Sequence, residues 1–265
     1  MSYRTIISVV NEQTTSAVTA RYAMAIATFC GSELVLYAAH GADEHTHRHS
    51  KRHLEHLFGI ASEQGIPVKQ VVEAGSMARM LPNYVQSVNA DLVFYPLAPG
   101  EQYGAPLQQH TIHHLLRTVR ADLAIMRIVH MGRLHPTSIL APFGATIGGS
   151  GKRELFITAL VKSFHAQVTL LHLATGSAGN GMPGDVVRFR DELQRQNITV
   201  LERSGRGRIA KAIAVEAITR HNDLIVLGAS ERSTLKRLFL GNPAGDVMHK
   251  PPCNAILFRA ALELS

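Results

Sequence analysis

The residues best suited to chemistry are small ones that follow an apolar run near the end of the chain. They form the pattern Gly228-x-x-Glu231, then nine residues, then Gly241-Asn242. A backbone that contains glycine can approach a phosphate closely and present its N–H groups. Glu231 opposes this, because a carboxylate near a phosphate costs about 1 kcal/mol per close charge pair in water. We therefore predict a weak phosphate or anion site near Gly228 and Gly241.

Basic residues near this pattern could offset Glu231. The segment Ser204-Gly205-Arg206-Gly207-Arg208 follows a predicted strand and leads into a helix, and Arg232 lies within the pattern itself. Guanidinium groups and helix N-termini both attract anions. All of the net charge of +7 lies in residues 133–265, which also suggests an anionic partner. The predicted site therefore includes Arg206, Arg208 and Arg232; the alternative is that these charges are solvated.

A second candidate is the His-rich segment 40–56, which holds six of the fifteen histidines. If a helix begins near Ser50, His53 and His56 share one face and His49 lies within reach. Imidazole and carboxylate groups at this density can bind Zn²⁺ or a related transition metal. We predict His49, His53 and His56 as candidate ligands, with a solvated loop as the alternative.

Motifs for other functions are not visible. The sequence has no Gly-x-Ser-x-Gly elbow, no complete Lys-bearing P-loop and no His-Glu-x-x-His helix. Few aromatic residues and no recognition motif argue against nucleic-acid binding. Apolar runs are too short to span a bilayer and the N-terminus does not resemble a signal peptide, so we expect a cytoplasmic protein with no membrane contact. Two cysteines at non-equivalent positions predict no disulfide framework.

The elements that must position these residues alternate between strands and helices. The predicted strands are 3–10, 33–39, 68–73, 91–97, 122–129, 138–142, 167–173, 198–203, 223–228 and 255–259. The predicted helices are 16–30, 50–64, 77–89, 106–117, 152–164, 186–196, 208–221 and 243–249. Segments 41–49 and 175–184 are expected to be irregular. Continuous apolar runs such as VTLLHL indicate strands covered on both faces.

Repeated β-α-β units with short turns predict an α/β fold with doubly wound, mostly parallel, Rossmann-like sheets. Ligands in such folds sit at the carboxyl ends of the strands, where the strand order reverses.

The chain is also an internal duplication. Residues 223–259 align with residues 91–127 without a gap, at an offset of 132. A long period present only twice indicates a duplicated domain rather than a solenoid. We predict two domains, 1–130 and 136–265, each with a five-stranded sheet. Only the second keeps the small residues of the ligand pattern, because the first has Pro96, Pro99, Gln109 and His110 there.

The segment GASERSTLKRLFLGNPAGDVMHKPPCNAILFR resembles the C-terminal signature of universal stress proteins, G-x2-G-x9-G-[S/T]. The resemblance covers most of the second half and, without the glycines, the first. It implies that Gly228, Gly241 and Asn242 hold ATP phosphates. The family also has an adenine-binding Asp after the first strand, where this chain has Gly144 in the second half and Asn11 in the first. Glu231 replaces the second glycine of the signature.

Together these features predict a tandem universal stress protein that acts as a non-enzymatic stress-response or regulatory module. Its second half would bind ATP or another anion weakly. The alternatives are a slow nucleotide-hydrolysing enzyme and a His-rich metal-binding protein. The resemblance also implies that the halves pair as a pseudo-dimer through residues 124–127 and 255–259, with a homodimer as a further option.

Overall fold

The computed structural model describes residues 3–41, 44–97, 106–144, 151–174, 182–229 and 243–261. The chain divides into two compact units. The first comprises residues 1–134 together with 259–265, and the second comprises residues 135–258.

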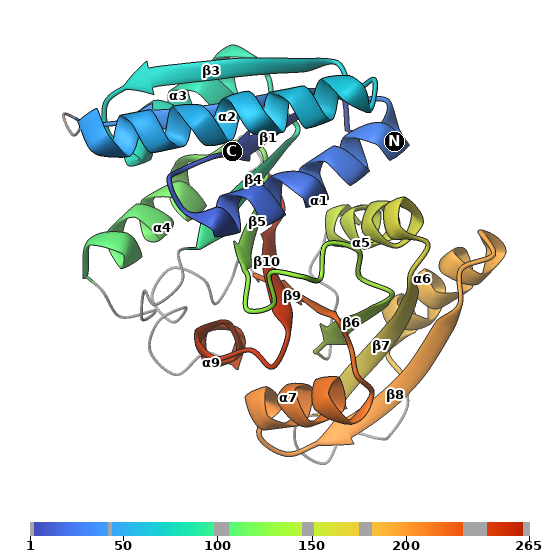
Figure 1. Ribbon diagram of the computed structural model, residues 1–265. Helices are drawn as coiled ribbons and strands as arrows, with labels where there is room; N and C mark the ends of the chain where they lie inside the picture. The colour runs from blue at the N-terminus through green and yellow to red at the C-terminus, as the bar shows by residue number, and fades with distance from the viewer. Residues whose placement is uncertain are drawn as a thin grey trace. The chain divides into compact units, whose positions relative to one another are not determined.

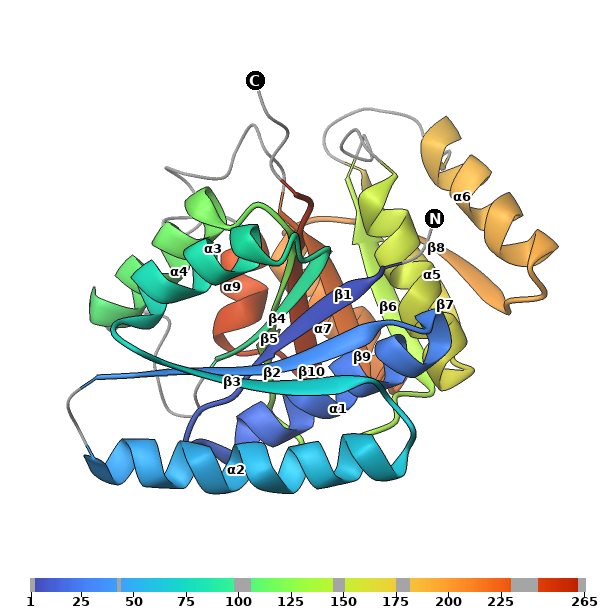
Figure 2. The same ribbon diagram turned by 90° about the horizontal axis from the view of Figure 1, so that it is seen from above.

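The first unit is a parallel sheet with helices on both faces. Its described strands are β1 (Thr5–Val9), β2 (Glu33–His40), β3 (Val68–Ala74), β4 (Leu92–Leu97) and β5 (Asp122–Arg127), in the order β3-β2-β1-β4-β5. Its described helices are α1 (Thr14–Cys30), α2 (Glu44–Glu63), α3 (Met77–Ser87) and α4 (Pro106–Thr118). Figure 2 shows α1 and α2 on one face of the sheet and α3 and α4 on the other.

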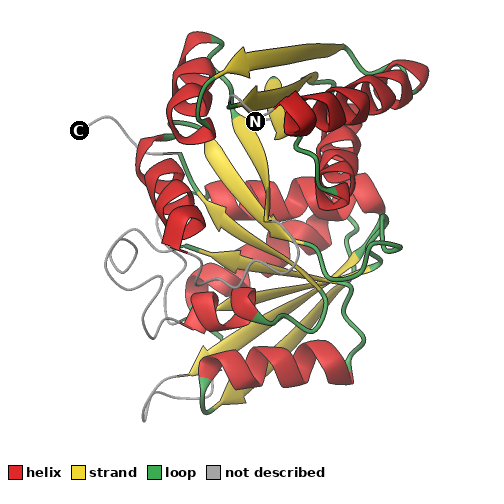
Figure 3. Cartoon of the chain, turned by 60° about the vertical axis from the view of Figure 1, so that its left-hand side comes forward, coloured by secondary structure: helices red, strands yellow, loops and turns green. Residues whose placement is uncertain are grey.

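The second unit repeats this plan. Its described strands are β6 (Ser138–Phe143), β7 (Gln167–Ala174), β8 (Val200–Arg206), β9 (Leu224–Gly228) and β10 (Asn254–Arg259), in the order β8-β7-β6-β9-β10. Its described helices are α5 (Lys152–Phe164), α6 (Gly184–Arg195), α7 (Ile209–Thr219) and α9 (Pro243–His249), labelled in Figure 1. α7 packs against α9, and the strands lie between helices as in the first unit (Figure 3).

Burial explains why these runs form sheets covered on both sides. Strands β5, β6 and β10 are buried at every position. A strand with solvent on one face would instead alternate buried and exposed residues. The predicted doubly wound α/β fold is therefore confirmed in both units.

Several predicted boundaries are also confirmed. Gly31 ends α1 in the left-handed region at a φ of 67°. Its N–H donates to the carbonyl oxygen of Thr28 at 3.4 Å, and the N–H of Ser32 donates to that of Ala27 at 2.9 Å, which closes the last turn. The prediction that residues 41–49 are irregular is wrong, because α2 already begins at Glu44. The segment from Glu44 to Phe58 contains neither glycine nor proline, which favours a helix. The acidic residue Glu44 in the first turn also stabilises the helix, because its negative charge interacts favourably with the helix dipole. The segment predicted to be irregular at 175–184 lies mostly outside the described residues.

Two further sequence expectations concern cysteines and membranes. Cys30 and Cys253, which both lie in the described part of the chain, form no disulfide. Among the described residues, none of the helices has the length and apolar content needed to cross a membrane.

Candidate functional site

The candidate site lies where the strand order of the second unit reverses. In the chain β6 is followed by β7, which lies on one side of it, whereas β9 lies on its other side. The β6–β9 ladder pairs Ile139 with Leu224 and Leu140 with Ile225. The equivalent β1–β4 ladder continues for one more pair, to Ser8 and Phe94. Pro142 near the end of β6 has no N–H to donate to a neighbouring strand. The carboxyl ends of β6 and β9 therefore need another partner.

Arg153 supplies that partner from the first turn of α5. Its Nη2 donates to the carbonyl oxygen of Pro142 at 2.7 Å and to that of Val226 at 2.8 Å. One guanidinium nitrogen thus bridges β6 and β9 beyond their ladder. The guanidinium carbon also lies 4.3 Å from the ring centroid of Phe143, close enough for a cation–π contact. Phe143 in turn contacts Phe189 of α6 edge-on, with 6.1 Å between ring centroids.

The electrostatics around Arg153 mark this place as unusual. Burial lowers the pKa of the Arg153 guanidinium to about 10, and the neighbouring Glu154 carboxylate opposes that shift. The group is therefore still cationic at neutral pH. Three buried polar atoms here find no hydrogen-bond partner among the described residues: Nε of Arg153, Oε2 of Glu154 and Nδ1 of His172. His172 lies next to Phe143 in the β6–β7 register. Buried polar atoms normally have partners, so these three atoms retain hydrogen-bonding capacity.

Gly228 is the one predicted glycine that the structure places at this site. It ends β9, and a Cβ on it would lie 3.0 Å from Nη1 of Arg153 and 3.1 Å from its Cδ. The residue thus accommodates the Arg153 side chain, a role that the sequence did not reveal. Glycine was predicted there for close approach of a phosphate.

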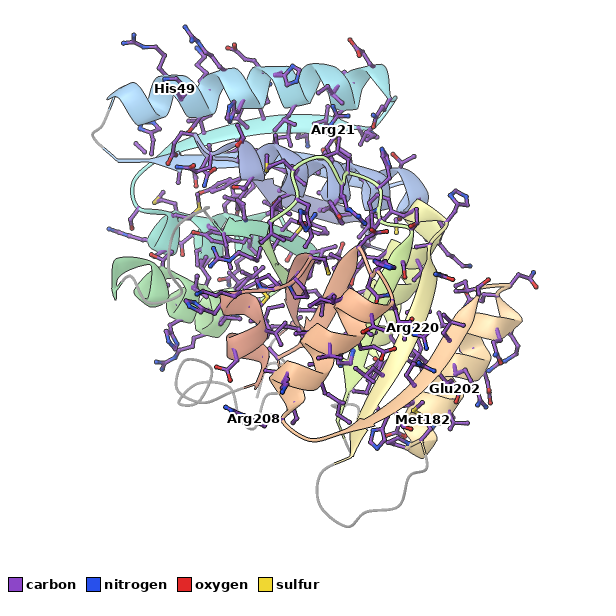
Figure 4. All side chains as sticks on the ribbon, turned by 60° about the horizontal axis from the view of Figure 1, so that its bottom comes forward. Arg21, His49, Met182, Glu202, Arg208 and Arg220 are labelled. Atoms are coloured by element: carbon purple, nitrogen blue, oxygen red, sulfur yellow. The ribbon has the colours of Figure 1, made fainter. Side chains whose placement is uncertain are left out.

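The other predicted anion ligands are less well placed. Arg208 is exposed at the start of α7 (Figure 4). Arg206 ends β8, and its side chain lies outside the described part of the structure. Arg232, Gly241 and Asn242 lie outside the described residues, as does Glu231.

Sequence reasoning missed Arg153 altogether, although a signal was present. A cation in the first turn of a helix faces the positive end of the helix dipole, which is unfavourable. An arginine there implies that its side chain has a purpose elsewhere. Gly144, where the resemblance implied an adenine-binding Asp, follows β6 and is exposed.

The predicted metal ligands all lie on α2, but the structure does not bring them together. His49 and His56 are exposed, whereas the Nδ1 of His53 lies 3.0 Å from the carbonyl oxygen of Asn11 (Figure 4 labels His49). His53 is thus turned toward Asn11, just beyond β1. No group of three metal-ligating side chains occurs within the described parts of the chain.

Comparisons with known proteins agree with this architecture. Residues 155–259 match the model of the universal stress protein family. A universal stress protein from Archaeoglobus fulgidus shares 12% identity, with a TM-score of 0.70 over 97% of this chain and 96% of that one. A functionally unknown protein from Pseudomonas aeruginosa shares 15% identity, with a TM-score of 0.67 over 97% and 93% of the two chains.

The fold by itself does not indicate one activity. The cytoplasmic domain of a prokaryotic cation chloride cotransporter is 12% identical, with a TM-score of 0.67 over 98% of this chain and 96% of that one. The sequence has no significant match among curated proteins. Structural likeness at such low identity establishes the fold, and the family assignment depends on the sequence match in the second half. Residues 155–259 thus match a universal stress protein domain.

Proposed function

We propose that the chain is a tandem universal stress protein whose second unit binds a phosphate-bearing ligand and acts by binding rather than by turnover. The observation that carries this proposal is the cationic guanidinium of Arg153 at the reversal point between β6 and β9. Ligands of doubly wound sheets bind outside the carboxyl ends of the strands at this point. The positive charge of the second half favours the same class of ligand.

The division of labour follows from the differences between the two units. The first unit shares the topology of the second, but its β1–β4 ladder is longer. The carbonyl oxygen of Asn11, just beyond β1, lies near the side-chain oxygen of Ser16 and Nδ1 of His53. We propose that this unit has a structural role and that the two halves pair within one chain, in the cytoplasm.

Calorimetric titration of the full chain with ATP, ADP and pyrophosphate tests the binding function. We expect saturable binding at one site per chain. Gly228→Leu should abolish it by placing a bulky side chain at the end of β9. Gly59→Leu on α2 is the matched control, because a Cβ at Gly59 meets nothing within 4 Å. If none of the three ligands shows saturable binding at millimolar concentration, the proposal is wrong.

The two alternative functions have their own tests. Labelled ATP incubated with purified protein and a divalent metal should remain intact; steady turnover would indicate a nucleotide-hydrolysing enzyme instead. If the protein binds metal, zinc should remain bound to untagged protein after purification, and elemental analysis would detect it. The contribution of His49, His53 and His56 is then measured by replacing all three with alanine.

A further inference from the structure

The reversal point between β6 and β9 already holds a side chain. Nη2 of Arg153 is within hydrogen-bonding distance of carbonyl oxygens on both strands, Pro142 on β6 and Val226 on β9. Its Nη1, Cδ and Cζ atoms fill the space above Gly228. A ligand that enters this crevice therefore meets a guanidinium group rather than an open slot between the strands.

The aromatic surface at this edge is covered as well. Phe143 is 2% exposed, and the Arg153 guanidinium lies over its ring at 4.3 Å from the centroid. A nucleotide base needs an exposed flat or apolar surface against which to stack. The arginine occupies that surface on Phe143, so the nucleoside part of a nucleotide gains little here.

The same side chain keeps unused capacity for an anion. Arginine has five N–H donors, and the hydrogen bonds described here use Nη2 alone. The Nε atom is buried and finds no partner among the described residues. His172, the register partner of Phe143, leaves its Nδ1 unpaired in the same way. Planar guanidinium groups bind the oxygen atoms of phosphate through short, charge-assisted hydrogen bonds.

We propose that Arg153 determines the ligand class of the second unit: it holds a compact phosphate-type anion at the ends of β6 and β9 and gives no favourable place to a nucleoside. This inference rests on the proposed binding function and narrows its ligand to phosphate-type anions without a nucleoside. Inorganic polyphosphates and small phosphorylated metabolites share the required chemistry.

Pyrophosphate and ADP form a suitable pair of probes, because both carry a diphosphate and only ADP carries adenosine. Calorimetric titrations would compare the full-length parent with Arg153→Met. We expect the parent to bind pyrophosphate at least as tightly as ADP. Arg153→Met should weaken pyrophosphate binding about tenfold, the equivalent of ~1.4 kcal/mol. Arg188→Met on α6 is the control, since its side chain is 80% exposed, and should leave pyrophosphate affinity unchanged.

Arg153→Lys is a second variant for the case that Arg153→Met does not fold. Lysine keeps the positive charge but lacks the planar guanidinium group that bridges two carbonyl groups. The Arg153→Lys variant should bind pyrophosphate more weakly than the parent. Parent protein that binds ADP tenfold more tightly than pyrophosphate would overturn the inference and leave the proposed function intact. Equal pyrophosphate affinities in the parent and folded Arg153 variants would overturn it too. Failure of the parent to bind either probe would instead reject the proposed function itself.

Discussion

Gly228 has no side chain at the place where the guanidinium of Arg153 crosses the end of β9. A Cβ on Gly228 would stand 3.0 Å from Nη1 and 3.1 Å from both Cδ and Cζ of Arg153. The glycine and the arginine therefore form one packing unit, 75 residues apart in the sequence. This relationship gives the glycine a structural reason that is independent of phosphate binding.

Gly228→Ala tests that packing unit. The added methyl group should displace the flexible Arg153 side chain by a few tenths of an ångström and strain its bonds to Pro142 and Val226. We expect a loss of about 1 kcal/mol in the free energy of unfolding, the scale of one hydrogen bond. Gly144→Ala is the control, because its Cβ would meet nothing within 4 Å and any entropic gain of alanine over glycine is shared. Urea denaturation measures both, and equal stabilities would contradict the packing role.

The sequence was sufficient to predict the alternation of strands and helices in both units. Apolar runs such as those of β4 and β9 are long, bounded by polar turns and repeated at a fixed offset, so each copy supports the other. Helix ends were predictable where glycine marks them, as Gly31 does after α1. The start of α2 was missed because histidine is a weak helix former in isolation, although the segment from Glu44 to Phe58 contains neither glycine nor proline.

The candidate site was predicted only in part. Its position followed from the strand order, and Gly228 lies there. Arg153 could not be assigned from local pattern, because its partners are carbonyl groups of β6 and β9 that become neighbours only when the sheet forms. The metal site at His49, His53 and His56 stays a prediction: the described residues contain no group of three metal-ligating side chains, and Nδ1 of His53 lies 3.0 Å from the carbonyl oxygen of Asn11, 42 residues away in the chain.

Two aspartates provide a test of the duplicated architecture. Asp91 accepts backbone N–H groups of Arg4 and Thr5 at 2.8 and 2.9 Å. Asp223 accepts the N–H and hydroxyl of Thr137, at 2.9 and 2.7 Å, and the N–H of Ser138 at 3.2 Å. Both aspartates therefore bind the backbone where the first strand of their unit begins.

Alanine at either aspartate should lower the free energy of unfolding by about 2 kcal/mol, because backbone N–H groups lose a charged acceptor. We expect the larger loss at Asp223, which accepts more bonds. Asp185→Ala, which removes an exposed ion pair with Arg188, should cost no more than about 1 kcal/mol. Chemical denaturation ranks the three variants, and a cost at Asp223 no greater than that at Asp185 would argue against this role.

The C-terminal cap of α5 offers a stabilising change. His165 follows α5 with a φ of 52°, in the left-handed region. Gly31 holds the equivalent position after α1, with a φ of 67°. A residue with a Cβ loses about 1 kcal/mol or more in this conformation. His165→Gly should therefore raise the free energy of unfolding by about 1 kcal/mol, and Gly31→Ala should lower it by a similar amount. A destabilised His165→Gly protein in urea denaturation would show that the imidazole makes a compensating contribution.

Tyr37 should make the first unit sensitive to alkaline pH. Its hydroxyl donates to Oε2 of Glu73 at 2.5 Å, and its ring stacks on Tyr84 with 5.1 Å between centroids. Burial, followed by the hydrogen bond and the negative charge of Glu73, raises the pKa of Tyr37 well above its ordinary value. Above pH ~10, tyrosine in the unfolded chain releases its proton while folded Tyr37 retains it. The folded state then binds more protons than the unfolded chain, so the stabilising contribution of Tyr37 is complete below pH ~10 and falls as the pH rises further.

Tyr37→Phe tests this contribution, because phenylalanine cannot ionise. The free energy of unfolding of this variant should start about 1 kcal/mol lower, for the lost hydrogen bond, and should decline less steeply between pH 9 and pH 11. Parallel urea denaturation curves across this range measure the two slopes, and identical slopes would mean that Tyr37 does not contribute to the alkaline loss.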